Sequence, residues 1–126
     1  MSYKPVAQKL LIKEKDTVLL INEPKNYRPI LGTLPASVTV TSAAACAELI
    51  QVFVTSKKEL EEYLPKLKTQ LSKKGLLWVT YPKGSSKVKT DVNRDKIAAY
   101  AKTVGLQAVA MISIDDTWSA LRVKLS

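Results

Sequence analysis

The chain has 126 residues, of which 46% are hydrophobic and 25% charged, with one cysteine and no histidine. We expect a single domain over residues 1–126, because dividing this length in two would leave neither half a sufficient core. The absence of histidine excludes imidazole as a metal ligand and as the base of a Ser/His or Cys/His pair. Any catalysis would have to rely on Lys, Tyr, Asp or Glu.

The chain is strongly basic, with 20 Lys and Arg against 11 Asp and Glu and a formal charge of +9. Such a charge favours anionic partners, nucleic acid among them. The lysines are dispersed along the chain, however, which is more typical of a solvated basic surface than of one binding face.

Two features of the sequence bear on its compartment. The apolar runs are far shorter than the roughly 20 residues of a membrane span. Cys46 is the only cysteine, so an internal disulfide is impossible, and a lone thiol fits a reducing compartment. We expect a soluble, cytoplasmic protein that does not bind membranes, with Cys46 as a small buried residue in its alanine-rich segment.

The first half of the chain predicts one helix and three strands. Residues 5–12 form a short helix, with a proline suited to its first turn. Residues 17–22 are continuously apolar, a pattern typical of a central parallel strand that is covered on both faces. Residues 38–41 and 49–54 are rich in apolar and β-branched side chains and predict two more strands, joined by a helical or turn-like connection over 42–48.

The next helix has the clearest local signal in the chain. Ser56 and Glu59 form a capping box, in which the serine accepts from the glutamate amide and the glutamate reaches back. Leucines at helical spacing then extend the helix to Lys73-Lys74-Gly75. Pro65 predicts a kink or a division into two helices.

A strand, a loop and a third helix follow. Residues 76–81 predict a strand, which Pro82 ends. The helix then runs from Asp91 or Asn93 to Val104, and Asp91 is expected to cap it. Asp91 as a general base is the alternative interpretation.

The chain ends in two strands, residues 106–114 and 120–125. Only residues 115–119 join them, which suits an antiparallel hairpin and excludes a helical crossover. The sequence therefore predicts an α/β, three-layer Rossmann-like fold, with a mostly parallel sheet and a C-terminal antiparallel hairpin. If the final strand lies inside the sheet, residues 106–114 become an uncharged edge, which is compatible with a homodimer.

Two features of this order resemble the methyltransferases that use S-adenosylmethionine. Residues 73–79, Lys-Lys-Gly-Leu-Leu-Trp-Val, are similar to the segment that leads into the fifth strand of that family. The terminal hairpin is similar to the one that inserts an antiparallel strand into the family's sheet. The resemblance implies the strand order 2-1-4-5-7-6 in the family's scheme, with its third strand missing.

The chain departs from that family where the cofactor binds. A glycine-rich turn follows the first strand in such enzymes, because only a backbone without side chains can approach the cofactor closely there. Residues 22–27 contain no glycine, and Pro24 and Pro29 allow at most a turn or two of helix. The acid expected after the second strand is also missing, so S-adenosylmethionine is disfavoured and the cofactor is left unidentified.

A more specific resemblance is to a small bacterial family of unknown function with this degenerate fold. Its motifs are an aromatic-Pro-Lys element, here Tyr81-Pro82-Lys83, then a serine-rich loop with Ser85-Ser86 and Thr90-Asp91. A late Asp-x-Thr-Trp-Ser, residues 115–119, completes the pattern. This resemblance implies the fold but no activity.

Ligands of an open parallel sheet bind beyond the carboxyl ends of its strands. The residues that the sequence places there are candidates for a ligand site: Asn22, Tyr27, Tyr81, Lys83, Ser85, Ser86, Lys87, Asp115, Asp116 and Trp118. Backbone amides and lysines of the Lys83 loop would suit an anion. No metal site is predicted.

Each candidate also has a structural interpretation. The Lys83 loop is more typical of a mobile basic surface loop than of an anion site. Turn formation and capping explain Asp115 and Asp116 as well as, or better than, paired carboxylates. Trp118 is more typical of core or hairpin packing than of stacking on a ligand.

Three hypotheses for the function remain. The leading one is a non-catalytic methyltransferase-like domain that binds an anionic small ligand or a protein partner. The second is nucleic-acid binding, which the charge of +9 favours and the lack of a recognised motif opposes. The third is an enzyme of unknown reaction that uses Tyr81, Lys83 and the Asp115/Asp116 pair at the sheet edge.

Overall fold

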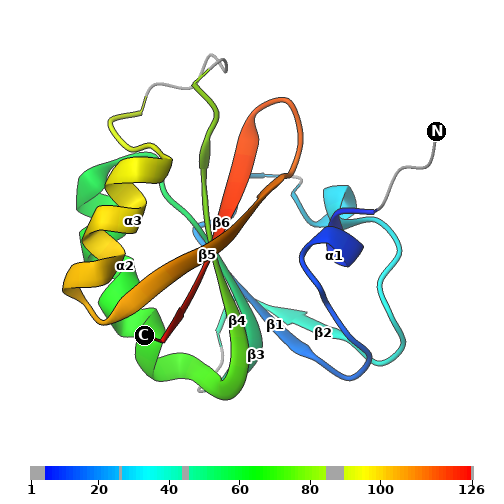
Figure 1. Cartoon of the computed structure of the whole chain (residues 1–126). Helices are drawn as coiled ribbons and strands as arrows, with labels where there is room; N and C mark the ends of the chain where they lie inside the picture. The colour runs from blue at the N-terminus through cyan, green and yellow to red at the C-terminus, as the bar shows by residue number, and fades with distance from the viewer. Residues whose placement is uncertain (1–4, 26, 44–45, 85–89, 126) are drawn as a thin grey trace.

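A single six-stranded sheet forms the centre of the protein (Figure 1). The structure, a computed structural model, describes residues 5–25, 27–43, 46–84 and 90–125. The strand order is β2-β1-β3-β4-β6-β5, which matches the order that the methyltransferase resemblance implies. The strands are β1 (Thr17–Ile21), β2 (Thr39–Thr41), β3 (Ala47–Phe53), β4 (Leu71–Pro82), β5 (Leu106–Ser113) and β6 (Trp118–Leu125).

The strand directions confirm the predicted mixed sheet. Strands β2, β1, β3 and β4 are parallel to one another, whereas β6 is antiparallel to both β4 and β5. Strand β6 therefore lies inside the sheet and β5 forms its edge, with an irregular register between Ala108 and Ala110.

Two layers of unequal thickness cover the sheet. Helices α2 (Lys57–Gln70) and α3 (Arg94–Thr103) lie on one face, and the short α1 (Val6–Lys9) and the 3₁₀ turn η1 (Arg28–Leu31) lie on the other (Figure 1). The α/β three-layer fold is confirmed, with one layer reduced to single turns. None of the described helices is long and apolar enough to span a membrane.

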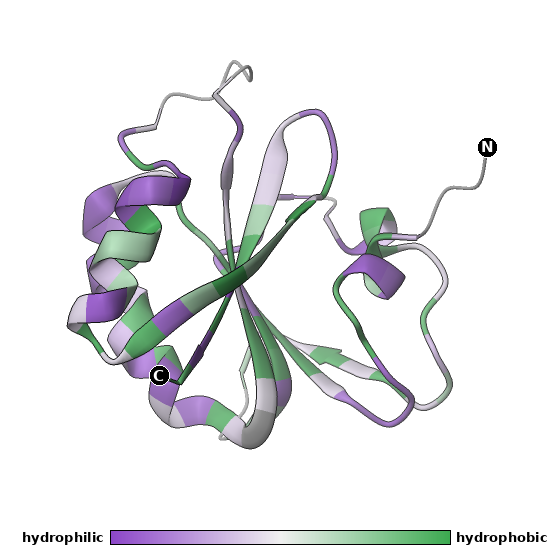
Figure 2. Ribbon diagram, viewed as in Figure 1, coloured by the Kyte–Doolittle hydropathy of each residue, from purple (hydrophilic) through white to green (hydrophobic). Residues whose placement is uncertain are grey.

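The apolar runs of the sequence explain why β1 and β3 are central. Val18 and Leu20 of β1 pack in the cluster on the α1 side, and Leu19 packs in the cluster on the α2 side. Both faces of the strand are buried, so a continuous apolar run is what its position requires. Figure 2 shows the same hydrophobic character along the neighbouring strands and polar residues on the outer surfaces of the helices.

Helix α2 ends earlier than its leucine periodicity predicts. It runs through Pro65 without dividing and stops at Gln70, and Leu71 is already extended, with ψ at 131°. Leu71 pairs with Ala47 of β3, so pairing in the sheet wins over the local helical pattern. Pro65 costs the helix about 3 kcal/mol, which the burial of Leu64 and Leu67 beside it offsets.

The connection before β3 is also shorter than expected. Ala47 and Glu48 belong to the strand, so residues 42–46 join β2 to β3, and residues 44 and 45 of this connection lie outside the described part of the chain. Cys46 is exposed, and its prediction as a buried residue was wrong. It precedes the strand, where the chain has not yet entered the sheet.

Helix α3 confirms its predicted position but not its predicted cap. The side chain of Asn93 accepts from the Lys96 amide at 2.9 Å and caps this helix. Asp91 instead accepts from the Lys57 amide at 2.6 Å, so it caps the start of α2. The two helices are thereby tied together at the ends that lie beside the loops of the sheet.

Candidate functional site

The carboxyl ends of β1, β3 and β4 and the β5–β6 turn meet at one edge of the sheet. The Asn22 side chain after β1 donates to the carbonyl of Phe53, the last residue of β3, at 2.8 Å. The Lys83 amide after β4 donates to the Thr117 carbonyl in the hairpin at 2.7 Å. These contacts join segments that are far apart in the sequence, and we refer to this edge as the carboxyl edge.

Asn22 lies at the position where an open α/β sheet usually binds its ligand. The connections after β1 and β3 leave toward opposite faces of the sheet, so the crevice between these strands is the topological switch point. Asn22 has a φ of 60°, which asparagine tolerates better than most residues. Its amide nitrogen donates to the Phe53 carbonyl and to a Glu59 carboxylate oxygen, each at 2.8 Å. The side chain thus bridges the crevice.

Glu59 completes this bridge and was not among the predicted site residues. Its other carboxylate oxygen accepts from the Thr55 amide at 2.8 Å and the Thr55 hydroxyl at 2.9 Å. Burial raises the pKa of Glu59, but hydrogen bonds from Thr55, Asn22 and Ser56 outweigh it and hold the pKa below its ordinary value of 4.5. The capping box was the sequence signal for this residue, although it did not reveal the contact with Asn22.

Replacing Asn22 with glycine tests the bridge, because glycine keeps the positive φ and removes the amide. We expect the free energy of unfolding to fall by about 1–2 kcal/mol, since two hydrogen bonds are lost. Urea denaturation monitored by tryptophan fluorescence measures this change. A variant as stable as the parent chain would show that the bridge contributes nothing.

The lowered pKa of Glu59 also sets the sign of a pH dependence. A carboxyl with a depressed folded-state pKa contributes stability above its unfolded value of 4.5, and that contribution is lost as the pH falls through the folded value. The parent chain should therefore lose more stability between about pH 7 and about pH 3 than a Glu59→Gln variant. Equal losses in the two proteins would contradict this assignment.

Tyr27 lies inside the core rather than in the open loop. Its hydroxyl donates to Gln51 Oε1 at 2.8 Å, and its ring packs edge-on against Phe53 with centroids 4.6 Å apart. Burial raises its pKa well above the ordinary value, so the phenol stays protonated. Tyr27 therefore supports the floor of the crevice.

The hairpin candidates fall into structural positions. Asp115 accepts from the amides of Thr117 and Trp118, each at 2.8 Å, and so forms the turn. Asp116 is exposed. Trp118 is half-buried and packs edge-on against Phe53 at 5.2 Å. The contacts of Asp115 and Trp118 match their structural interpretations.

The candidates at the end of β4 and just after it contact the edge strand β5. The Tyr81 hydroxyl donates to Met111 Sδ at 3.2 Å, and Lys83 Nζ donates to Ser113 Oγ at 2.7 Å. Lys9 Nζ reaches the Ser113 carbonyl from α1 at 3.2 Å. The predicted site residues Ser85, Ser86 and Lys87 lie outside the described residues.

A hollow of about 350 Å³ opens beside Tyr81. Asn93 and Arg94 line it from the start of α3, together with Asp95, and Met111 lines it from β5. Burial raises the pKa of Tyr81 above its ordinary value, although Arg94 and a hydrogen bond with Ser119 lower it. The phenol is therefore protonated at neutral pH and can donate a hydrogen bond.

Sequence reasoning missed Arg94 and Met111 for different reasons. Arg94 looked like an ordinary first residue of a helix, and Met111 like one more apolar residue of a strand. Only the pairing of β5 with β6 places Met111 opposite Leu121 and hence on the α3 side of the sheet.

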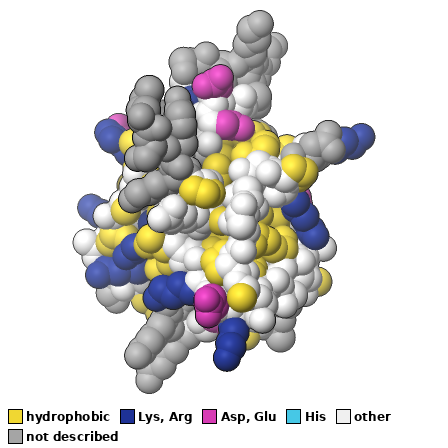
Figure 3. Space-filling view, turned by 90° about the vertical axis from the view of Figure 1, so that its right-hand side faces the viewer, with side chains coloured by type: hydrophobic (Ala, Val, Ile, Leu, Met, Phe, Trp, Pro, Cys, Tyr) yellow, Lys and Arg dark blue, Asp and Glu magenta, His cyan; other side chains and the backbone are white. Residues whose placement is uncertain are grey.

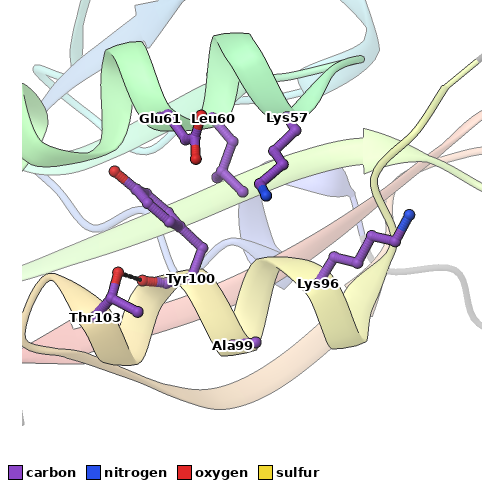
Figure 4. A pocket seen from close by; sticks show the side chains of 7 residues that line it. All are labelled: Lys57, Leu60, Glu61, Lys96, Ala99, Tyr100 and Thr103. Carbon is purple, nitrogen blue, oxygen red and sulfur yellow. Dashed lines mark hydrogen bonds between the residues drawn. The ribbon is translucent and has the colours of Figure 1, made fainter.

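A larger hollow, of about 570 Å³, separates α2 from α3 (Figure 4). Lys57, Leu60 and Glu61 extend into it from α2, and Tyr100 extends into it from α3. Lys96 at its end donates to the Asp91 carbonyl at 3.1 Å. This groove combines an apolar wall with charges of both signs.

The described basic residues are not concentrated on the face that carries α1, where the Lys and Arg side chains are scattered (Figure 3). Arg28 there pairs with Glu23 at 3.1 Å. The described residues also contain no group of three or more His, Cys, Asp or Glu placed to hold a metal.

The fold is similar to that of solved methyltransferases. A ribosomal protein L11 methylase from Lactobacillus delbrueckii subsp. bulgaricus superposes with a TM-score of 0.64 at 11% identity, over 95% of this chain and 74% of that one. A TehB-like SAM-dependent methyltransferase from Corynebacterium glutamicum gives 0.61 at 11% identity, over 99% and 90%. A SAM-dependent methyltransferase from Bacteroides fragilis, in complex with S-adenosyl-L-homocysteine, gives 0.61 at 10%, over 99% and 78%.

At these identities the likeness concerns the fold alone. A search of curated proteins found no match to the chain. A sequence family described as a protein of unknown function, DUF3052, matches residues 41–126, which include β3 to β6 and both long helices. This match spans more than half of the chain and contains the Tyr81-Pro82-Lys83 and Asp115-to-Ser119 motifs. The chain therefore belongs to the DUF3052 family of proteins of unknown function, and its fold is that of the methyltransferases.

Proposed function

We propose that the protein is a non-catalytic, methyltransferase-like domain that binds a small anionic ligand or a protein partner at the carboxyl edge. The observation that carries this proposal is the bridge from Asn22 to Phe53 and Glu59. It occupies the switch point, which is where ligands of this kind of sheet are usually held. A ligand of this domain is therefore bound elsewhere along the edge.

The contacts of the bridge oppose binding of S-adenosylmethionine in the crevice. The Asn22 nitrogen uses its hydrogens on Phe53 and Glu59, and opening it would cost about 1–3 kcal/mol for each polar group left without a partner. The loop that follows contains no glycine until Gly32, so side chains stand where a close approach of the backbone would be needed.

The polar groups of the edge support a binding role over catalysis. Tyr27 and Tyr81 are kept protonated by burial, which raises the pKa of each phenol. The Asp115 carboxylate accepts two amides of its own turn. Those groups have structural partners, and no histidine is available to move a proton near neutral pH.

Isothermal titration calorimetry with S-adenosylmethionine and S-adenosyl-L-homocysteine tests this proposal. We expect no saturable heat with either compound at protein concentrations of about 100 μM, which corresponds to a dissociation constant above the millimolar range. Micromolar binding, or methyl transfer to any acceptor, would overturn the proposal. A methyltransferase with an intact glycine-rich turn serves as the positive control.

A further inference from the structure

We propose that the hollow beside Tyr81 binds a compact oxyanion, a carboxylate or phosphate that carries a short apolar group. This inference rests on the proposed function and names the ligand class and the position at the same edge. The hollow measures about 350 Å³, at the lower end of the range for small-molecule sites. Its lining combines hydrogen-bond donors and a cation with one apolar wall.

The Tyr81 hydroxyl is the first donor. It takes part in a hydrogen bond with Ser119, and its own hydrogen is directed at a sulfur atom. It lies at the end of a buried ring and donates to Met111 Sδ at 3.2 Å. A thioether sulfur is a weak acceptor, whereas a carboxylate or phosphate oxygen is a strong one. The Tyr81 hydroxyl would therefore form a stronger hydrogen bond with an oxyanion in the hollow than the one it forms with sulfur.

Arg94 supplies the positive charge. Its Nε lies 3.6 Å from Asp95 Oδ1, and the two side chains are 59% and 88% exposed. An exposed pair at this distance contributes little, so the guanidinium can turn to a ligand at small cost. Its planar set of donors suits the oxygens of a carboxylate or phosphate.

Lys83 does not line the hollow but adds a second cation beside its lining residues Tyr81 and Met111. Lys83 follows Tyr81 by two residues, and Ser113 follows Met111 by two residues on β5. The Tyr81 hydroxyl donates to Met111, and the Lys83 ammonium donates to Ser113. Within the described part of the chain, Lys83 makes no ion pair with a carboxylate. The pair of cations favours an anion, and the Met111 side chain gives its apolar part a wall.

The lining also limits the size of the anion. Asp95 also lines the hollow and repels anions, and this repulsion is largest for an extended polyanion, so a compact ligand fits better than a nucleic-acid backbone. The larger groove between α2 and α3 is a poorer anion site. Glu61 lines it, and its Lys96 and Thr103 side chains already donate to backbone carbonyls.

Titration with phenyl phosphate, benzoate and inorganic phosphate, followed by amide chemical shifts in NMR spectra, tests the site. At physiological salt we expect saturable shifts that are centred on residues 81, 93–95 and 111. Phenyl phosphate should bind at least about threefold more tightly than inorganic phosphate, because the ring buries apolar surface. Equal affinity would overturn the apolar part of the proposal.

Variants separate this site from general attraction to a basic protein. Arg94→Gln should weaken phenyl phosphate about tenfold, and Tyr81→Phe by about threefold or more, because each loses a donor to a charged oxygen. The matched control, Lys57→Gln with Lys96→Gln, removes two charges beside the other groove and should change the affinity less than twofold. Equal weakening in Arg94→Gln and the control, or no saturation at all, would overturn the proposal.

The results of these titrations can be distinguished from those of the calorimetry with S-adenosylmethionine. Micromolar binding of S-adenosylmethionine with an unchanged response at Tyr81 would overturn the proposed function and leave this site in place. No binding of either kind of compound would overturn this site and leave the bridge at the switch point intact.

Discussion

Replacing Gln51 with leucine will lower the free energy of unfolding by about 2–4 kcal/mol. Gln51 is fully buried in β3 and connects two other buried groups. Its Oε1 accepts from the Tyr27 hydroxyl at 2.8 Å, and its Nε2 donates to Thr80 Oγ1 at 2.9 Å. Leucine fills a similar volume but leaves both hydroxyls without this partner, away from water.

A triple variant distinguishes lost partners from poor packing. In Gln51→Leu with Tyr27→Phe and Thr80→Val, the hydroxyls that lost their partner are also removed, and most of the lost stability should return. Urea denaturation of the single and triple variants gives both values. If Gln51→Leu alone were within about 0.5 kcal/mol of the parent chain in stability, the hydrogen bonds of Gln51 to Tyr27 and Thr80 would not contribute as assigned.

Replacing Trp78 with alanine will have the largest effect on the core, about 3–5 kcal/mol. The side chain is 1% exposed and packs in the cluster between the sheet and α1. Its Nε1 donates to the Leu10 carbonyl at 3.0 Å, across 68 residues of sequence. Val6 and Ala7 of α1 are buried in the same cluster, so the loss of the indole removes both a hydrogen bond to this segment and packing beneath it.

Trp78→Phe is the matched control, because it keeps an aromatic ring and removes the donor. It should cost clearly less than alanine, about 1–2 kcal/mol. Hydrogen exchange adds a second measurement: in Trp78→Ala, the amides of residues 8–12 should exchange faster than those of α3. If both variants lost the same free energy of unfolding, the cavity left by alanine would not be the main cause of the loss.

The sequence predicted the location of the candidate site better than its contacts. Asn22 and Lys83 were placed at the carboxyl edge because each follows an apolar run that had to be a parallel strand. Asp115 was placed there because a hairpin this short returns at the same edge. Tyr27 was placed in an open loop, but the turn η1 carries it into the core, where Gln51 offers its hydroxyl a buried acceptor.

The errors in the secondary structure have a common cause. The periodicity of α2 continues to Leu71, yet that residue pairs with Ala47 and begins β4. Asp91 precedes a helix and looks like its cap, yet it caps another helix, 34 residues away in sequence. In both places a partner distant in the sequence wins over an equally good local pattern.

By itself the sequence determined the order of the elements, the mixed sheet and the absence of a glycine-rich turn after the first strand. These features are local, because apolar periodicity, prolines and glycines act on the segments that contain them. The tertiary structure alone decided that Asn22 bridges to Glu59, and that Tyr81, Arg94 and Met111 line one hollow. Such contacts depend on the register of neighbouring strands and on how the helices pack across the sheet, and residues distant in the sequence set both.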